Sequence, residues 1–138
     1  MRNKNIDKVL IAVAGAVLWA AFMIIPAQAA EHTKDSLDKV QEGLKDKKVI
    51  LLDVREQSEW DDGHLRDAVL LPLSKLRKLD ADAVARDLPK DKVIYIHCAS
   101  GVRVLPAADI LIKHGYDARP LKPGYEKLLK AGFPKAEK

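Results

Sequence analysis

The sequence contains a single cysteine, Cys98, in 138 residues. One thiol cannot close a disulfide within the chain, so the fold has to be stabilised by its own apolar core. The sequence also lacks internal repeats, low-complexity stretches and any linker rich in proline and glycine. A chain of this length without such divisions is predicted to form one domain.

Long blocks of like charge are absent as well. The chain has 24 basic and 20 acidic residues, and the two kinds are interspersed. Residues 1–29 contain three of the basic residues and one acidic residue, so the rest of the chain has a net charge of only +2. Without a basic block, the sequence gives no support to nucleic-acid binding.

The N-terminus has the three parts of a secretory signal peptide. Three basic residues precede an uncharged apolar run of 17 residues, Val9–Ile25, and Ala27-Gln28-Ala29 follows. This pattern predicts a signal peptide over residues 1–29 that is cleaved before Ala30, which leaves residues 30–138 as an exported domain. The alternative is an uncleaved membrane anchor, for which about 17 residues is the lower limit.

The remaining chain alternates between strand and helix patterns, which predicts an α/β fold with a mostly parallel sheet flanked by helices. Reactive sites in such sheets gather at the carboxyl ends of the strands. Expected strands are 49–52, 69–71, 93–96 and 118–121. Expected helices are 33–46, 58–61, 74–86 with Ser74 as its cap, a helix that ends near Gly115, and 125–130.

Cys98 lies at the end of the expected strand 93–96, in the segment Cys98-Ala99-Ser100-Gly101-Val102-Arg103. Backbone N–H groups of a tight turn and the N-terminus of the following helix both stabilise negative charge there. Arg103 adds a permanent cation, and Gly101 permits a conformation that other residues resist. These features predict a nucleophilic thiolate and a cradle for a small anionic substrate. A buried core cysteine, the alternative, would not need Gly101 and Arg103 beside it.

Four segments occur in the order and spacing of one family's signatures. They are Leu52–Glu56 with Glu59-Trp60; Gly63-His64-Leu65 with Ala68 and Leu71-Pro72-Leu73; Cys98–Arg103; and Gly124 with Ala131-Gly132-Phe133-Pro134. From about residue 33 to Pro134, the chain resembles the rhodanese (thiosulfate sulfurtransferase) domain. Together with a signal peptide, it is similar to the small periplasmic sulfurtransferases of Gram-negative bacteria.

The resemblance implies a ping-pong sulfur transfer without metal or organic cofactor. Cys98 would take the outer sulfur of thiosulfate, or of a similar anionic donor, and pass it to a thiol, a protein or, in vitro, cyanide. The loop residues Ala99, Ser100, Gly101, Val102 and Arg103 would bind the donor. Val104 replaces the small polar residue that is common in the family, which bears on donor affinity.

Other polar residues are assigned mainly structural roles. Arg55 and Glu59 are candidates for lining the site, although a structural ion pair beneath the loop explains them more simply. Asp53 is interpreted as a buried hydrogen-bond anchor, and His97 as a residue that positions Cys98. The remaining histidines are interpreted as a turn residue (His64) and as surface residues (His32 and His114).

Three alternatives belong to other classes. Cysteine phosphatases and arsenate reductases place five residues between cysteine and arginine, whereas this chain has four, which makes a smaller cradle. A persulfide carrier that serves one partner fits the same residues, and a non-catalytic binding module would not need the loop. A zinc or copper site is disfavoured by one cysteine and scattered histidines.

Overall fold

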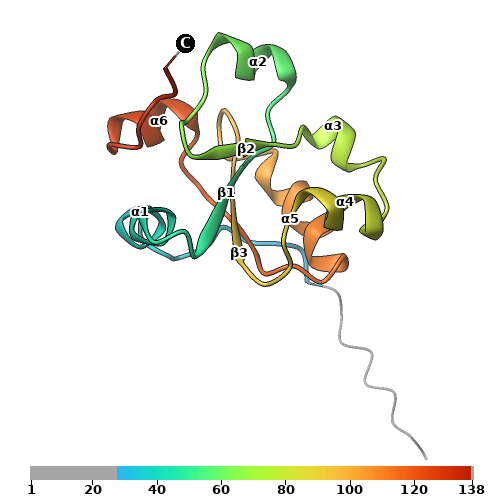
Figure 1. Cartoon of the computed structure of the whole chain (residues 1–138). Coiled ribbons are helices and arrows are strands. Elements are labelled where there is room, and N and C mark those ends of the chain that lie inside the picture. Colours follow the sequence, from blue (N-terminus) through green and yellow to red (C-terminus); the bar gives the residue numbers. More distant parts are fainter. Residues whose placement is uncertain (1–27, 138) are drawn as a thin grey trace, which may run out of the picture.

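The computed structural model describes residues 28–137, which form a four-stranded sheet with six helices (Figure 1). The strands are β1 (Val49–Asp53), β2 (Ala68–Leu70), β3 (Val93–His97) and β4 (Ala118–Pro120). The helices are α1 (Leu37–Lys45), α2 (Gln57–Asp62), α3 (Leu73–Leu76), α4 (Ala81–Asp87), α5 (Val104–Lys113) and α6 (Tyr125–Lys130). The predicted signal peptide lies outside the described residues up to position 27. From residue 28 to 137, no helix has the length and apolar character needed to cross a membrane.

All strand pairs in the sheet are parallel, and the strand order is β2-β1-β3-β4. The chain passes from β1 to β2 on one side and then returns to β3 on the other side of β1. Ligands of open α/β sheets bind at such a reversal, beyond the carboxyl ends of the strands. The sheet therefore offers a site where β1 and β3 end, and the predicted α/β class with a parallel sheet is confirmed.

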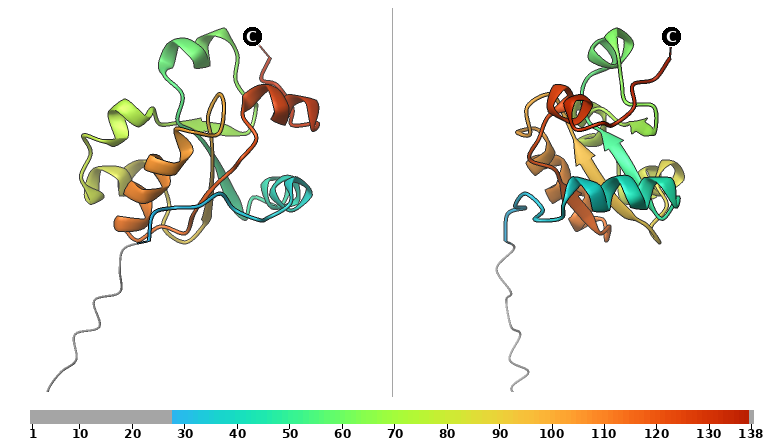
Figure 2. Two further views of the ribbon diagram at one scale, coloured as in Figure 1. Left: turned by 180° about the vertical axis from the view of Figure 1, so that it is seen from behind. Right: turned by 90° about the vertical axis from the view of Figure 1, so that its left-hand side faces the viewer.

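Side chains of the two central strands alternate between two apolar layers. Leu52, Ile94 and Ile96 pack with residues of α3, α4 and α5, whereas Leu51 and Tyr95 pack with residues of α1 and α6. Figures 1 and 2 show these two groups of helices on opposite faces of the sheet. Because successive residues of a strand face opposite ways, a strand covered on both faces has to be apolar throughout.

The expected helix over residues 74–86 is wrong, because two shorter helices, α3 and α4, occupy this region. The side chain of Asp80 accepts a hydrogen bond from the Ala83 N–H, which caps a new helix at that point. Pro72, not Ser74, precedes the first turn of α3, and the Ser74 hydroxyl donates to Glu56 instead. A strong internal cap therefore overrides the continuous apolar pattern.

We predict that Leu111→Ala destabilises the protein by about 2–5 kcal/mol, because Leu111 is fully buried and its loss leaves a cavity. Ile112→Ala is the matched control, since Ile112 lies next to it on α5 and is 49% exposed. Its loss should cost less than about 1 kcal/mol. Urea unfolding of both variants measures the difference, and equal losses would contradict this packing.

Candidate functional site

The cysteine loop, Cys98–Arg103, joins the end of β3 to the start of α5. In the register of the sheet, His97 on β3 lies beside Asp53 on β1, so the loop begins where the chain direction reverses. The Cys98 side chain is completely buried, and the Gly101 N–H donates a hydrogen bond to its Sγ at 3.2 Å. Cys98 is thus part of the core and also the centre of a turn whose amide points at the sulfur.

A segment from the other end of the sequence, Lys122–Tyr125, supports the loop from behind. Gly101 has φ +84°, and a Cβ there would overlap the Lys122 carbonyl oxygen. A Cβ on Gly124 would likewise overlap the Ala99 carbonyl oxygen. The Tyr125 N–H donates to the Cys98 carbonyl at 2.9 Å. Two glycines therefore let two backbones meet directly, which fixes the shape of the loop.

Several amides of the cysteine loop are free to bind a ligand. Among the described residues, no protein group accepts a hydrogen bond from the N–H of Ala99, Ser100, Val102 or Arg103. Arg103 itself precedes the first turn of α5. Successive unpaired amides at a helix N-terminus form a concavity that suits an anion.

Arg103 is not a free cation, because Glu59 of α2 binds it through two hydrogen bonds of 2.7 Å. This pairing lowers the pKa of Glu59 to about 2 and raises that of Arg103. A third hydrogen bond to Glu59, from the Glu56 N–H, orients the carboxylate through a capping box at the start of α2. Glu59 therefore neutralises and anchors the arginine on which the prediction of anion binding partly relied.

Beneath the loop lies a buried cluster made of Asp53, Arg55 and His97. The Arg55 guanidinium donates to both Asp53 carboxylate oxygens and to the Gly63 carbonyl, and it lies 4.1 Å from the centre of the Tyr125 ring. His97 Nε2 lies 3.5 Å from Asp53 Oδ2. Burial lowers the pKa of His97, with Asp53 opposing the shift, so the imidazole is neutral at pH 7. This cluster supports the loop, and only Arg55 of its three members has any exposed surface.

Two hollows flank the cysteine loop. The first, about 320 Å³, is lined by Arg55, Glu59, Asp62, Gly63, Ala99, Tyr125, Glu126 and Lys135. The other is lined by Glu56, Leu73, Ser74, Arg77, Val102, Arg103 and Pro106. Because Asp53 pairs with Arg55 and Arg103 pairs with Glu59, the remaining charges of the first hollow are mostly carboxylates.

A model of the rhodanese-like domain matches residues 36–131, most of the chain that the structure describes. The chain belongs to the rhodanese-like domain family. A rhodanese-related protein from Thermoplasma volcanium has the same fold, with a TM-score of 0.60 and 26% identity over 72% of this chain and 92% of that one.

Two of the curated relatives are much larger proteins. A probable molybdopterin-synthase adenylyltransferase of Gracilaria tenuistipitata var. liui is 39% identical over 67 residues, which are 49% of this chain and 19% of that protein. A probable adenylyltransferase/sulfurtransferase of Mycobacterium tuberculosis, MoeZ, is 33% identical over 100 residues, which are 71% of this chain and 25% of that protein. This rhodanese-like chain thus spans a quarter or less of the length of these two relatives.

Within the rhodanese-like fold, some of the predicted site residues lie in the cysteine loop and others lie outside it. Within the loop, Gly101 contacts the sulfur of Cys98, whereas Ala99, Val102 and Arg103 line the two flanking hollows. Arg55 is buried and also lines the first of these hollows. The predicted ion pair between Arg55 and Glu59 is wrong, because Arg55 pairs with Asp53 and Glu59 with Arg103. Asp53 is the buried anchor that the sequence predicted.

The structure confirms the interpretation of one histidine, His64, and contradicts that of another, His32. His64 stacks on Trp60 with ring centres 3.7 Å apart and binds the Trp60 carbonyl, as a turn residue would. The interpretation of His32 as a surface residue is wrong, since it is half-buried and its Nε2 lies 2.7 Å from the Gly101 carbonyl oxygen. No sequence signal placed His32 near the loop, because 69 residues separate the two groups.

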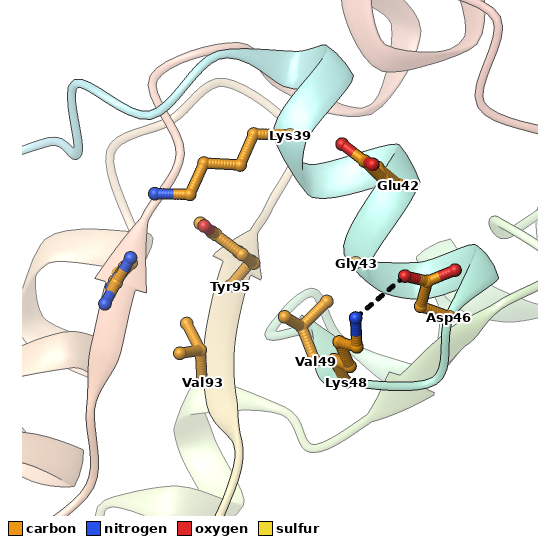
Figure 3. A pocket seen from close by; sticks show the side chains of 9 residues that line it. Lys39, Glu42, Gly43, Asp46, Lys48, Val49, Val93 and Tyr95 are labelled. Atoms are coloured by element: carbon orange, nitrogen blue, oxygen red, sulfur yellow. Dashed lines mark hydrogen bonds and ion pairs between the residues drawn. The ribbon is translucent and has the colours of Figure 1, made fainter.

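A further hollow, of about 250 Å³, lies at the opposite end of the sheet (Figure 3). Its floor is formed by Val49 and Val93, the first residues of β1 and β3, whereas Cys98 follows the last residue of β3. The basic residues that line it each form an ion pair with a carboxylate; they are Lys39, Lys48 and Arg119. It is therefore separate from the cysteine loop.

We predict that Gly101→Ala abolishes ligand binding by the amides of the cysteine loop and destabilises the fold by several kcal/mol. The new Cβ would require a left-handed conformation and would also meet the Lys122 carbonyl. Gly115→Ala is the matched control, because Gly115 has nearly the same φ, +85°, with no atom within 4 Å of the added Cβ. It should cost only about 1–2 kcal/mol. Thermal unfolding of both variants would contradict this account if the losses were equal.

Proposed function

We propose that this rhodanese-like protein is a sulfurtransferase in which Cys98 carries the transferred sulfur as a persulfide. The observation that supports it best is the Gly101 N–H, which donates to the single cysteine sulfur from a loop whose other amides find no acceptor among the described residues. Preorganised N–H donors stabilise anionic sulfur in the thiolate, the persulfide and the transition states between them. The adenylyltransferase/sulfurtransferase relative supports the same chemistry by its name.

The reaction has two displacements at sulfur. In the first, the Cys98 thiolate attacks the outer sulfur of thiosulfate, a new Sγ–S bond forms, and the old S–S bond breaks with its electron pair leaving on sulfite. In the second, an acceptor nucleophile attacks the outer persulfide sulfur, and the electron pair of the Sγ–S bond returns to Cys98. With cyanide as acceptor, the product is thiocyanate.

A carrier that delivers sulfur to a single partner protein is the second candidate. It is favoured by the relatives in which the matching region is only a quarter or less of a larger enzyme. A carrier would load once with sulfur and release it only to its partner, whereas an enzyme would turn over with thiosulfate and cyanide. A phosphatase is disfavoured because the loop has one residue fewer than a tetrahedral oxyanion requires.

We also propose that the protein works in the periplasm after export. The proposal rests on the signal-peptide pattern of residues 1–29 and on the cleavage site that precedes Ala30. Sequencing the N-terminus of the protein that accumulates in cells tests it directly. A chain that begins at Ala30 supports export with cleavage, and a chain that retains residues 1–29 contradicts it.

We predict that incubation with thiosulfate adds one sulfur, about 32 Da, to the protein, and that Cys98→Ser abolishes the gain, because only a thiolate can form the persulfide. Intact-mass spectrometry after removal of small molecules measures the gain. Cyanide should then restore the original mass and release thiocyanate. No gain in the reduced, folded protein would refute thiosulfate as donor.

We predict that Glu59→Gln lowers the KM for thiosulfate by about 3–10-fold, because it removes a negative charge from the approach of a dianion and leaves Arg103 unneutralised. Asp62→Asn is the matched control, since Asp62 lines the same hollow and forms no ion pair with Arg103. It should change KM less. Steady-state kinetics at low and high salt measure both effects. A higher KM in Glu59→Gln would contradict this effect of charge.

A further inference from the structure

The segment that precedes α1, residues 28–36, is bound to the rest of the fold at several points, including Asp35, which accepts from Tyr95 and Arg119; we call it the N-terminal strap. The Ala30 N–H donates to Asp109 Oδ1 of α5 at 2.7 Å. The Thr33 N–H donates to the Pro120 carbonyl of the edge strand β4 at 2.8 Å. Between these two anchors, His32 reaches the cysteine loop. Figure 2 shows the strap passing from α5 to α1.

The contact between His32 and the loop has one possible direction. The Gly101 carbonyl oxygen can only accept, so His32 Nε2 carries the hydrogen and donates it at 2.7 Å. Gly101 is therefore engaged on both sides, since its N–H donates to Cys98 Sγ and its C=O accepts from His32. One residue links the imidazole of the strap to the nucleophile.

This link also orients an amide that makes no hydrogen bond of its own. The structure has no cis peptide in the described residues, so the Val102 N–H points away from the Gly101 carbonyl of the same peptide plane. Among the described residues, no protein group accepts from this N–H. Donation to the carbonyl fixes the plane and polarises the peptide, which makes the Val102 N–H a better donor.

We propose that His32 is a positioning residue of the active site, which holds the Gly101 peptide so that the loop amides face the sulfur on Cys98. Its contribution to catalysis rests on the proposed sulfur transfer, whereas its contribution to the order of the loop does not. The anchors at Ala30 and Thr33 hold the strap in place for this contact.

The predicted cleavage before Ala30 would change the charge at one anchor of the strap. Cleavage before Ala30 turns the nitrogen that binds Asp109 into the terminal ammonium of the mature chain. The hydrogen bond at 2.7 Å would then join opposite charges, and charge-assisted bonds are about twice as strong as neutral ones. Removal of the signal peptide would thus tighten the strap that carries His32.

The test compares His32→Ala with His32→Gln, whose side-chain amide places a donor at a similar reach, and with His114→Ala as a histidine that does not contact the loop. The full chain is expressed, and the form that accumulates is purified and weighed. Hydrogen exchange of the peptide spanning the cysteine loop measures its order without requiring activity. Steady-state kinetics with thiosulfate and cyanide measure kcat and KM.

We expect His32→Ala to speed exchange of the loop amides by about 3–10-fold and to lower kcat by a similar factor with little change in KM. His32→Gln should recover most of both losses, and His114→Ala should match the unmodified protein. Unchanged exchange in His32→Ala, equal loss in His32→Gln, or faster exchange that extends to α4 would each overturn the proposal. Absence of sulfur transfer in the unmodified protein would refute the proposed function, while the exchange result would still decide the role of His32 in ordering the loop.

Discussion

The parallel pairing of β1 with β3 is the constraint on which the rest of the site depends. Its register places Asp53 beside His97, so the residues that follow the two strands, Arg55 and Cys98, emerge at the same edge. The apolar side chains on both faces leave this pair little freedom to slip, since a shift by one residue would reverse every side chain. Local chemistry at the loop is thus set by packing along the whole length of two strands.

The two arginines near the cysteine loop are each paired with a carboxylate. The buried Arg55 is matched by Asp53, and the partly exposed Arg103 is matched by Glu59. Attraction of an anion therefore falls mainly to backbone amides, which act at short range and select a small group by shape as well as by charge. In the proposed sulfur transfer, such a site would recognise the transferred sulfur more strongly than the rest of the donor.

The sequence predicts well what depends on local pattern. The strands, the last helix and the placement of Cys98 at a strand end follow from apolar runs and from the segment Cys98–Arg103. Prediction from the sequence fails where a competing cap or a distant segment determines the structure. Asp80 caps a new helix and so divides one expected helix in two. Glu59 binds Arg103 although 44 residues separate them in the sequence. No periodic pattern or motif in the sequence predicts the contact of His32 with Gly101, because His32 lies in the N-terminal strap, outside the helices and strands.

A loop of unpaired amides is costly to hold in one shape, since each N–H that faces the substrate is withheld from the hydrogen bonds that order ordinary turns. The order has to come from outside the loop. Here the Lys122–Tyr125 segment packs against its backbone, Glu59 binds the Arg103 side chain at its end, and His32 binds the Gly101 carbonyl. These supports come from three separate parts of the sequence, which explains why a six-residue motif needs a whole domain around it. The shape of the cysteine loop is therefore a property of the fold, and the motif only marks its position.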